Sequence, residues 1–471
     1  MRALRLAFRW IGAIVACLAF APLAVAAPKL PGGPHQVRHV FVIVLENESE
    51  ATSFGSATPA PYLAQRMTSR GAFLPNYYGV GHSSLDNYIA MVSGQAPNPS
   101  TQADCGVYAD FPPGGSPGAH GQQPGSGCIY PAGIPSIATQ LDAAGLSWRD
   151  YNESMGADPS REAAVCGHPP VGSPDNTEIA TSTDTYATRH NPFMYFHSII
   201  DDASLCDSHV VNLDRLPGDL RRISSTRDYT FITPDLCSDG HDTPCPAGGP
   251  GGLAQVNTFL QRWVPRITRS PAFRRDGLLI VTFDEAASSD ASSCCGEIPG
   301  PAAPLPGGTG PGGGDVGAVL LSPCIKPGTV SQTAYNHYTM LGSVENLFDL
   351  SHLGYAGLPG ETYFGSDIFK RQCGPSAPRA RLHATIRALG ASGRARVRLR
   401  WSASTRGGTA LAYYQLQERR GHGWHTLLRR TKRSSYSFTG AVPHLWRLRL
   451  RAVNLAGQNG RWSSAGAGAV S

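Results

Sequence analysis

The sequence predicts an α/β domain with a mainly parallel central sheet flanked by helices, followed by a small C-terminal all-β sandwich. Three observations predict this architecture. Apolar runs alternate with helical patterns over most of the 471 residues, the charge changes sharply near residue 376, and the C-terminal part alternates with a period of two. We therefore expect one large domain over residues 27–375 and a basic module over residues 376–471.

The N-terminal segment has the pattern of an export signal. Three arginines precede an apolar stretch from Trp10 to Leu23, and Ala24 to Ala26 offer small residues for cleavage. A lipoprotein processed at Cys17 is the alternative, but the apolar run continues past that residue. The pattern favours a cleaved signal peptide over residues 1–26 and a secreted or periplasmic product.

The cysteines predict disulfide bonds. Ten of the eleven cysteines follow the signal segment, and an even number in an exported chain indicates pairing. Their spacing contains no Cys-x-x-Cys pair, so we do not expect a zinc cage. Cys105 with Cys128 and Cys237 with Cys245 are the local pairs we expect, and the remaining pairing stays open.

Short apolar runs predict the buried strands of the large domain. They lie at His39–Leu45, Tyr229–Thr233, Leu278–Phe283 and Val316–Leu321. Helical patterns cover Leu253–Ile267 and Tyr338–Leu350. Parallel sheets of this kind bind ligands beyond the carboxyl ends of their strands.

The C-terminal module is strongly basic. From Ser376 onward it contains 17 arginines and one lysine against a single acid, Glu418. Apolar residues alternate with arginines over 396–401 and 447–452, which predicts strands with one buried and one cationic face. We expect Trp424, Trp446 and Trp462 in the core, and the stretch 446–462 resembles the last strands of a fibronectin type III domain.

Two interpretations of the cationic face remain open. It would bind lipid headgroups or another anionic envelope surface, or its arginines serve only as soluble outward residues. No specific nucleic-acid recognition is predicted.

Polar residues follow two of the predicted strands. Glu46 and Asn47 come after the first run, and Asp284 and Glu285 come after the third. Ser84 lies at the first turn of a helical pattern, where backbone N–H groups favour a phosphate. Any one of these features is common in loops and helix caps. Together they make an oxygen-rich site suited to one divalent metal ion, with calcium, magnesium, manganese and iron all open.

Six segments, in this order, resemble a bacterial phosphoesterase family that joins secreted acid phosphatases and phospholipases C and is related to the alkaline phosphatase superfamily. They are VIVLENES (42–49), GHSSLDNYIAMVSG (81–94), RHNPFMYF (189–196), PDLCSDGHD (234–242), VTFDEA (281–286) and NHYTMLGSVENLF (336–348). The resemblance implies an alkaline phosphatase-like sheet and hydrolysis of phosphate esters.

The resemblance also implies roles for individual residues. Ser84 would be both nucleophile and metal ligand, and the remaining metal ligands would be Glu46, Asn47, Asp284 and Glu285. In-line attack by a metal-activated hydroxyl on phosphorus is the expected chemistry.

Histidines would complete the site. His190 and His241 would contact the phosphate or protonate the leaving oxygen, and His82 is a weaker candidate for the same work. His337 would contribute to substrate binding, and Asp242 would orient His241.

The expected reaction is phosphate monoester hydrolysis, as in acid phosphatases and phosphoinositide phosphatases. A phospholipase C-type diesterase is the alternative, and a non-catalytic envelope-binding protein is a second one.

Overall fold

The computed structural model describes residues 37–112, 115–369, 378–404, 411–442, 444–454 and 459–467. The predicted signal segment, residues 1–26, lies outside these ranges, as does Cys373. Within them, no helix combines the length and the apolar character that a bilayer span requires.

An eight-stranded sheet forms the centre of the large domain, in the order β11-β2-β10-β9-β1-β8-β5-β7. Strands β9, β1, β8, β5 and β7 run parallel, whereas β10 is antiparallel to both of its neighbours. The strands are β1 (His39–Leu45), β2 (Ala72–Leu74), β5 (Trp148–Asn152), β7 (Val210–Asn212), β8 (Tyr229–Thr233), β9 (Gly277–Phe283), β10 (Ala318–Leu321) and β11 (Thr329–Val330).

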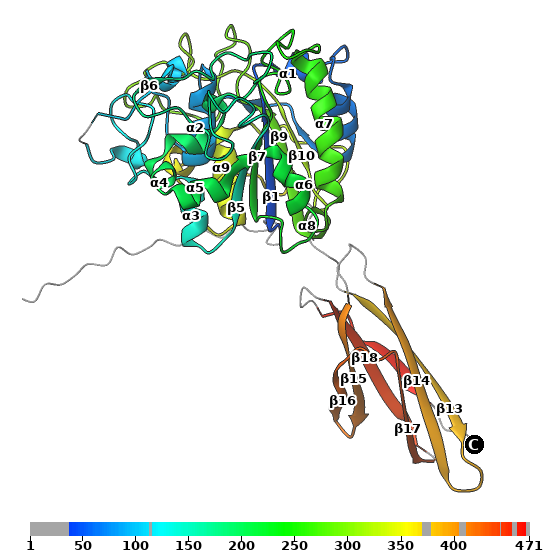
Figure 1. Ribbon diagram of the computed structural model, residues 1–471. Helices are drawn as coiled ribbons and strands as arrows, with labels where there is room; N and C mark the ends of the chain where they lie inside the picture. The colour runs from blue at the N-terminus through cyan, green and yellow to red at the C-terminus, as the bar shows by residue number, and fades with distance from the viewer. Residues whose placement is uncertain are drawn as a thin grey trace, which may run out of the picture.

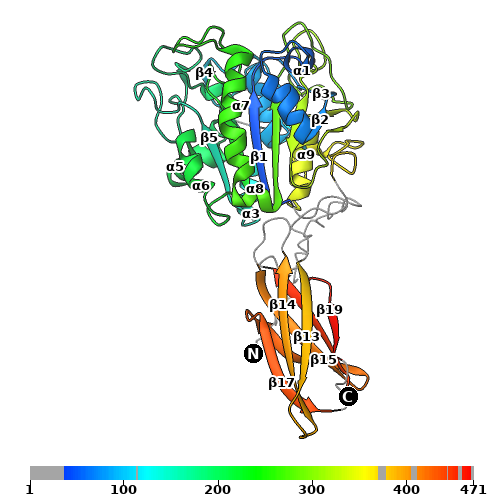
Figure 2. The same cartoon turned by 90° about the vertical axis from the view of Figure 1, so that its right-hand side faces the viewer.

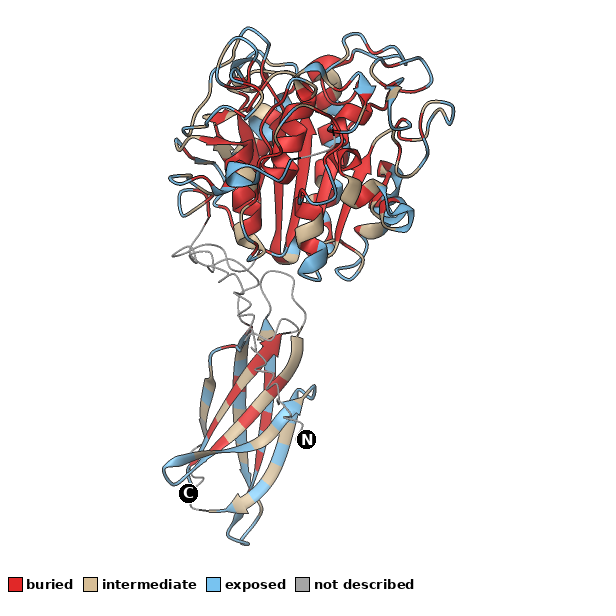
Figure 3. Ribbon diagram, turned by 90° about the vertical axis from the view of Figure 1, so that its left-hand side faces the viewer, coloured by how far each residue is buried: buried red, intermediate tan, exposed pale blue. Residues whose placement is uncertain are grey.

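Helices cover both faces of this sheet. Figure 1 shows the sheet between α7 (Gly252–Arg269) on one side and α2 (Ser84–Ser93) and α9 (His337–Leu347) on the other, and Figure 2 shows α7 in front of β1. Every residue of β1 is buried, as expected for a strand covered on both faces (Figure 3). The shorter helices are α1 (Glu50–Phe54), α3 (Ile137–Ala143), α4 (His197–Ile200), α5 (Ala203–His209), α6 (Leu216–Asp219) and α8 (Pro271–Asp276).

Most predicted elements of the sheet are confirmed. β1 and β8 have the predicted bounds, β9 begins one residue earlier, and α7 and α9 lie where the helical patterns predicted them. The run Val316–Leu321 differs, because its strand begins only at Ala318 and is antiparallel. Gly317 has φ +67°, a left-handed conformation that interrupts the extended chain.

Two antiparallel sheets with a core of their own form the C-terminal module. One has the order β13-β14-β17 and the other β16-β15-β18-β19, and buried residues of both sheets join in one hydrophobic cluster. Figure 3 shows buried and exposed residues alternating along these strands. The strands are β13 (Arg379–Ala388), β14 (Arg394–Ser404), β15 (Leu411–Arg420), β16 (Gly423–Thr431), β17 (Ser435–Ala441), β18 (Trp446–Asn454) and β19 (Ser463–Ala467).

Only one of the three tryptophans expected in the core lies there. Trp446 is buried, whereas Trp424 and Trp462 are half-buried and stack against the guanidinium of Arg449, at 4.0 and 4.3 Å from carbon to ring centre. The indoles therefore cover an arginine on the outer face of the sheet, a cation–π arrangement that periodicity cannot distinguish from core packing.

The described residues contain four disulfide bonds. The predicted pairs Cys105–Cys128 and Cys237–Cys245 are confirmed, and the other two bonds join Cys166 to Cys206 and Cys294 to Cys295.

Candidate active site

The carboxyl ends of β1 and β9 bring Glu46 and Asp284 together. The two strands are parallel neighbours with Leu45 paired to Phe283, so the acidic residue after each strand lies at the same edge of the sheet. Asn47, which adopts a left-handed φ of 57°, donates its backbone N–H to Asp284 Oδ1 at 3.1 Å. Sequence positions more than 200 residues apart thus meet at one point.

Helix α2 directs two hydroxyl groups at Glu46. Ser84 is the first residue of the helix after Ser83, and its Oγ donates to Glu46 Oε2 at 2.8 Å. Tyr88 lies one turn later on the same face, and its hydroxyl donates to Glu46 Oε1 at 2.6 Å. Both oxygens of this buried carboxylate therefore accept a hydrogen bond from α2.

His190 lies between two carboxylates. Its Nδ1 is 3.2 Å from Asp239 Oδ2, and its Nε2 is 3.4 Å from Glu46 Oε1. The imidazole stacks on the ring of Tyr88 with 5.2 Å between ring centres and 8° between planes. Glu46, His190 and Asp239 together form a group whose ligand atoms are close enough to share one metal ion.

The chemistry of this group fits a cation. Burial, with a smaller effect from the charge of Arg189, lowers the pKa of His190 well below its usual value, so the imidazole is neutral and has one N–H. Both of its nitrogens face a carboxylate oxygen, so one nitrogen lone pair points at an acceptor. A cation bound there would convert this repulsion into coordination.

The neighbouring carboxylates also lack compensating charge. Burial, together with the charges of Asp284 and Asp239, raises the pKa of Glu46 well above its usual value. Burial likewise raises the pKa of Asp284 to about 6, against the lowering effect of several hydrogen bonds. Asp284 Oδ2 and Asn47 Oδ1 are buried and have no hydrogen-bond partner among the described residues. Oxygen donors in this state suit a hard divalent ion.

Arg189 and His241 lie beside the ligand group. Arg189 is buried and donates to the backbone oxygen of Glu178 at 2.7 Å, while its Nη2 is 3.2 Å from His241 Nε2. Since arginine only donates, His241 Nε2 accepts, and its Nδ1–H donates to Asp242 Oδ1 at 2.8 Å. Asp242 thus contacts His241 as expected from the sequence.

A family model, described as the Phosphoesterase family, matches residues 57–351. The chain belongs to this Phosphoesterase family. The matched segment includes Ser84, His190, Asp239 and Asp284, and it begins after Glu46 and Asn47.

Several fungal acid phosphatases are similar to this chain. A probable acid phosphatase of Kluyveromyces lactis is 24% identical over 67% of this chain and 59% of its own length. A phosphate-repressible acid phosphatase of Penicillium chrysogenum is 24% identical over 61% of this chain and 55% of its own length. The chain therefore spans little more than half of these relatives. These relatives support membership of the family, and they do not assign the chain to a bacterial branch of it.

Two solved structures resemble the fold only distantly. Ps i-CgsB in complex with k-i-k-neocarrahexaose has a TM-score of 0.40 at 12% identity, over 83% of this chain and 86% of that chain. The lipoteichoic acid synthase LtaP from Listeria monocytogenes has a TM-score of 0.37 at 9% identity, over 92% of this chain and 88% of that chain. Neither likeness is close enough to carry an argument.

Two of the histidines expected in the phosphoesterase site have other contacts. His82 Nδ1 pairs with Glu285, and its Nε2 lies 3.0 Å from the backbone oxygen of Asp290. His337 is buried, with Nε2 at 2.5 Å from the backbone oxygen of Asp284 and Nδ1 at 3.2 Å from the Tyr77 hydroxyl. His337 therefore holds the end of β9.

The first turn of α2 is partly occupied by the protein itself. The backbone N–H of Leu85, where we expected a phosphate, donates to Asp104 Oδ1 at 2.9 Å. Any phosphate beside Ser84 must share this end of the helix with a carboxylate.

Three residues of the site were not selected from the sequence. Tyr88 lies four residues after Ser84, a spacing that places both on one helix face. Arg189 and Asp239 lie inside two of the segments that carry the family resemblance, where the expected roles fall on the neighbouring histidines His190 and His241. The motifs RHN (189–191) and SDGHD (238–242) were therefore the sequence signals from which Arg189 and Asp239 could have been identified.

Proposed function

We propose that this protein is a secreted, metal-dependent phosphoesterase that hydrolyses phosphate monoesters with Ser84 as the nucleophile. The hydrogen bond from Ser84 Oγ to Glu46 Oε2, 2.8 Å long, carries the proposal, because it places a hydroxyl beside a buried acidic cluster at the sheet edge. Membership of the Phosphoesterase family supports the same chemistry.

The proposed metal ligands are Glu46, Asn47, Ser84 and Asp284, joined by His190 and Asp239. When bound, one divalent cation would supply positive charge to the serine oxygen and the phosphoryl oxygens. Glu285 remains a weaker candidate for this set, because its carboxylate is paired with His82.

The residues around Ser84 would divide the remaining work. Glu46 Oε2 already accepts the hydroxyl hydrogen of Ser84, so it is placed to receive that proton as the oxygen attacks phosphorus. The guanidinium of Arg189 would bind nonbridging phosphoryl oxygens, since a planar donor pair matches them. His241, about one third exposed, would take up a solvent proton at Nε2, give it to the leaving alcohol and recover a proton from the incoming water.

The names of the relatives favour a monoesterase. The matched relatives are named as acid phosphatases. A phospholipase C-type diesterase is the second candidate, and it predicts turnover of phosphorylcholine esters.

A paired substrate assay tests the proposal. The purified mature protein is assayed with p-nitrophenyl phosphate and with p-nitrophenyl phosphorylcholine, before and after chelation and with add-back of calcium, magnesium, manganese or iron. We expect monoester turnover that chelation abolishes and one metal restores. Full activity in chelator would exclude the metal role, and faster turnover of the choline ester would favour the diesterase.

Export and surface binding complete the proposal. Four disulfide bonds are typical of an exported protein.

The outer face of β14 presents four exposed arginines without an ion pair or side-chain hydrogen bond among the described residues: Arg394, Arg396, Arg398 and Arg400. We propose that this row binds anionic lipid headgroups. The likeness to fibronectin type III stays a prediction.

Matched variants of the full chain test the arginine row. We expect Arg396→Gln/Arg398→Gln/Arg400→Gln to lose binding to vesicles containing anionic lipid at low salt. Arg419→Gln/Arg429→Gln/Arg447→Gln, an equal charge change on the other sheet, should retain it. Equal binding by both variants would assign the arginines to solubility alone.

A further inference from the structure

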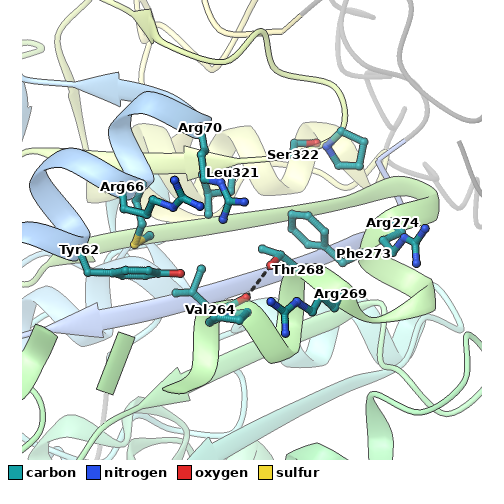
Figure 4. Close-up of a pocket in the computed structure, with 13 residues that line it drawn as sticks. Tyr62, Arg66, Arg70, Val264, Thr268, Arg269, Phe273, Arg274, Leu321 and Ser322 are labelled. Atoms are coloured by element: carbon teal, nitrogen blue, oxygen red, sulfur yellow. Dashed lines mark hydrogen bonds between the residues drawn. The ribbon is translucent and has the colours of Figure 1, made fainter. Parts of the chain in front are cut away.

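A pocket of about 650 Å³ lies apart from the candidate active site. Figure 4 shows its walls. One is formed by the short helical turns η1 (Tyr62–Met67) and η2 (Thr68–Arg70), and the other by the C-terminal turns of α7 together with α8. The backbone N–H of Tyr62 donates to Asn257 Oδ1 on α7 at 2.9 Å, which joins the two walls. This volume is in the range of small-molecule sites.

The pocket lies at the opposite edge of the sheet from Ser84. Leu321, at the end of β10, lines it and pairs with Leu279 near the start of β9, whereas Asp284 follows the far end of β9. A strand of seven residues is about 20 Å long. A ligand in this pocket therefore does not reach the candidate active site.

Four arginines surround the pocket. Arg66 and Arg70 come from η1 and η2, and Arg269 and Arg274 from α7 and α8. All four are exposed, and none has an ion pair or a side-chain hydrogen bond within the described ranges. Tyr62 lies among them: burial raises the pKa of its hydroxyl, while the charges of three of these guanidinium groups lower it. Several positive charges therefore converge on one point.

The floor of the pocket is apolar. Met67, Val264, Phe273 and Leu321 line it, and all four are buried. The hydroxyl of Thr268 already donates a hydrogen bond to the backbone oxygen of Val264 at 2.8 Å (Figure 4). An occupant must therefore offer an anion to the rim and an apolar surface to the floor.

We propose that this pocket binds a single-chain anionic amphiphile, with its carboxylate or phosphate head among Arg66, Arg70 and Arg269 and its alkyl chain on the apolar floor. A small inorganic anion would leave the space above the apolar floor filled with water, and a neutral lipid would place no negative charge beside the arginines. Both halves of the ligand are needed to satisfy the two halves of the pocket.

Calorimetric titration of the full-length mature protein with decanoate tests this site. The pocket variant is Arg66→Gln/Arg70→Gln/Arg269→Gln, and the matched control is Arg215→Gln/Arg221→Gln/Arg222→Gln, which removes three exposed arginines elsewhere. Since both variants keep the candidate active site, their difference reports on the pocket alone.

We expect decanoate to bind the wild type and the control, and to bind the pocket variant at least about tenfold more weakly at low ionic strength. Decanol and inorganic phosphate should each bind the wild type more weakly than decanoate does. The proposal is overturned if decanoate binds both variants equally or binds neither variant. It is also overturned if decanoate binds the wild type no more tightly than inorganic phosphate does.

Discussion

The hydroxyl of Tyr88 donates a 2.6 Å hydrogen bond to Oε1 of Glu46, and the ring of Tyr88 stacks on His190. One side chain thus holds two of the three residues that could share a metal ion. Because Ser84 donates to the other oxygen of Glu46, the orientation of this carboxylate is fixed from α2. The geometry of the ligand group therefore depends on the helix that also carries the proposed nucleophile.

Tyr88→Phe should weaken metal binding without unfolding the protein. It removes a hydrogen bond to a buried charged group, which contributes about 1.5–3 kcal/mol, and it keeps the stacked ring. Metal affinity from competition with a chelator is expected to fall by about tenfold or more. Tyr195→Phe is the control, since the buried Tyr195 hydroxyl has no hydrogen-bond partner in the described residues. Equal affinities for the two variants would contradict the role of Tyr88.

Ser84→Ala should abolish turnover of p-nitrophenyl phosphate. We expect a loss of roughly a thousandfold or more in kcat, because the proposed reaction has no other nucleophile. Ser83→Ala changes the adjacent hydroxyl, which donates to the backbone oxygen of Gln102 at 3.4 Å rather than to Glu46, and should retain most activity. If the Ser84 variant stays within about tenfold of wild type, the nucleophile lies elsewhere.

Asp239→Asn and Glu285→Gln distinguish the two possible ligand sets. Asp239 faces His190 at 3.2 Å, whereas Glu285 pairs with His82. We expect the Asp239 variant to lose bound metal, measured by elemental analysis after dialysis, and the Glu285 variant to keep it. The reverse result would restore the ligand set inferred from the sequence.

Asp150→Asn should change how stability depends on pH. Burial raises the pKa of Asp150 in β5 from 3.8 to about 7, so the folded state favours its protonated form. The stability this proton provides is fully present below pH 3.8 and is lost as pH rises to about 7, a loss of about 4 kcal/mol. The free energy of unfolding is measured by denaturant titration for the wild type and for Asp150→Asn. The wild-type value minus the variant value should fall between pH 4 and pH 8. A difference that does not vary with pH would contradict this assignment.

The sequence was sufficient for the central strands and for the residues that directly follow them. The run His39–Leu45 is apolar throughout because both faces of β1 are covered, and this fixes Glu46 at its end. The direction of β10 was not predictable, since an apolar run has the same composition in either direction. Its position depends on Gly317, whose left-handed φ is a property of the folded chain.

The proximity of Glu46, Ser84 and Asp284 was predictable from the sequence, whereas the contacts around them were not. Periodicity places Ser84 at the start of a helix, and strand order places Glu46 and Asp284 at one edge. The pairing of His82 with Glu285, and of His190 with Asp239, depends on loop conformations that a sequence pattern does not encode. The positions of Trp424 and Trp462 were not predictable for the same reason. A tryptophan that covers an arginine cannot be distinguished in the sequence from a tryptophan in the core.

The Cys237–Cys245 bond closes the loop that carries Asp239 and His241, and Cys105–Cys128 anchors the segment next to Asp104. Recombinant material made in a reducing cytoplasm would therefore have both loops untethered around an intact sheet. Thiol titration of each preparation, before any kinetic comparison of variants, would distinguish a candidate active site damaged by a substitution from one whose disulfide bonds never formed.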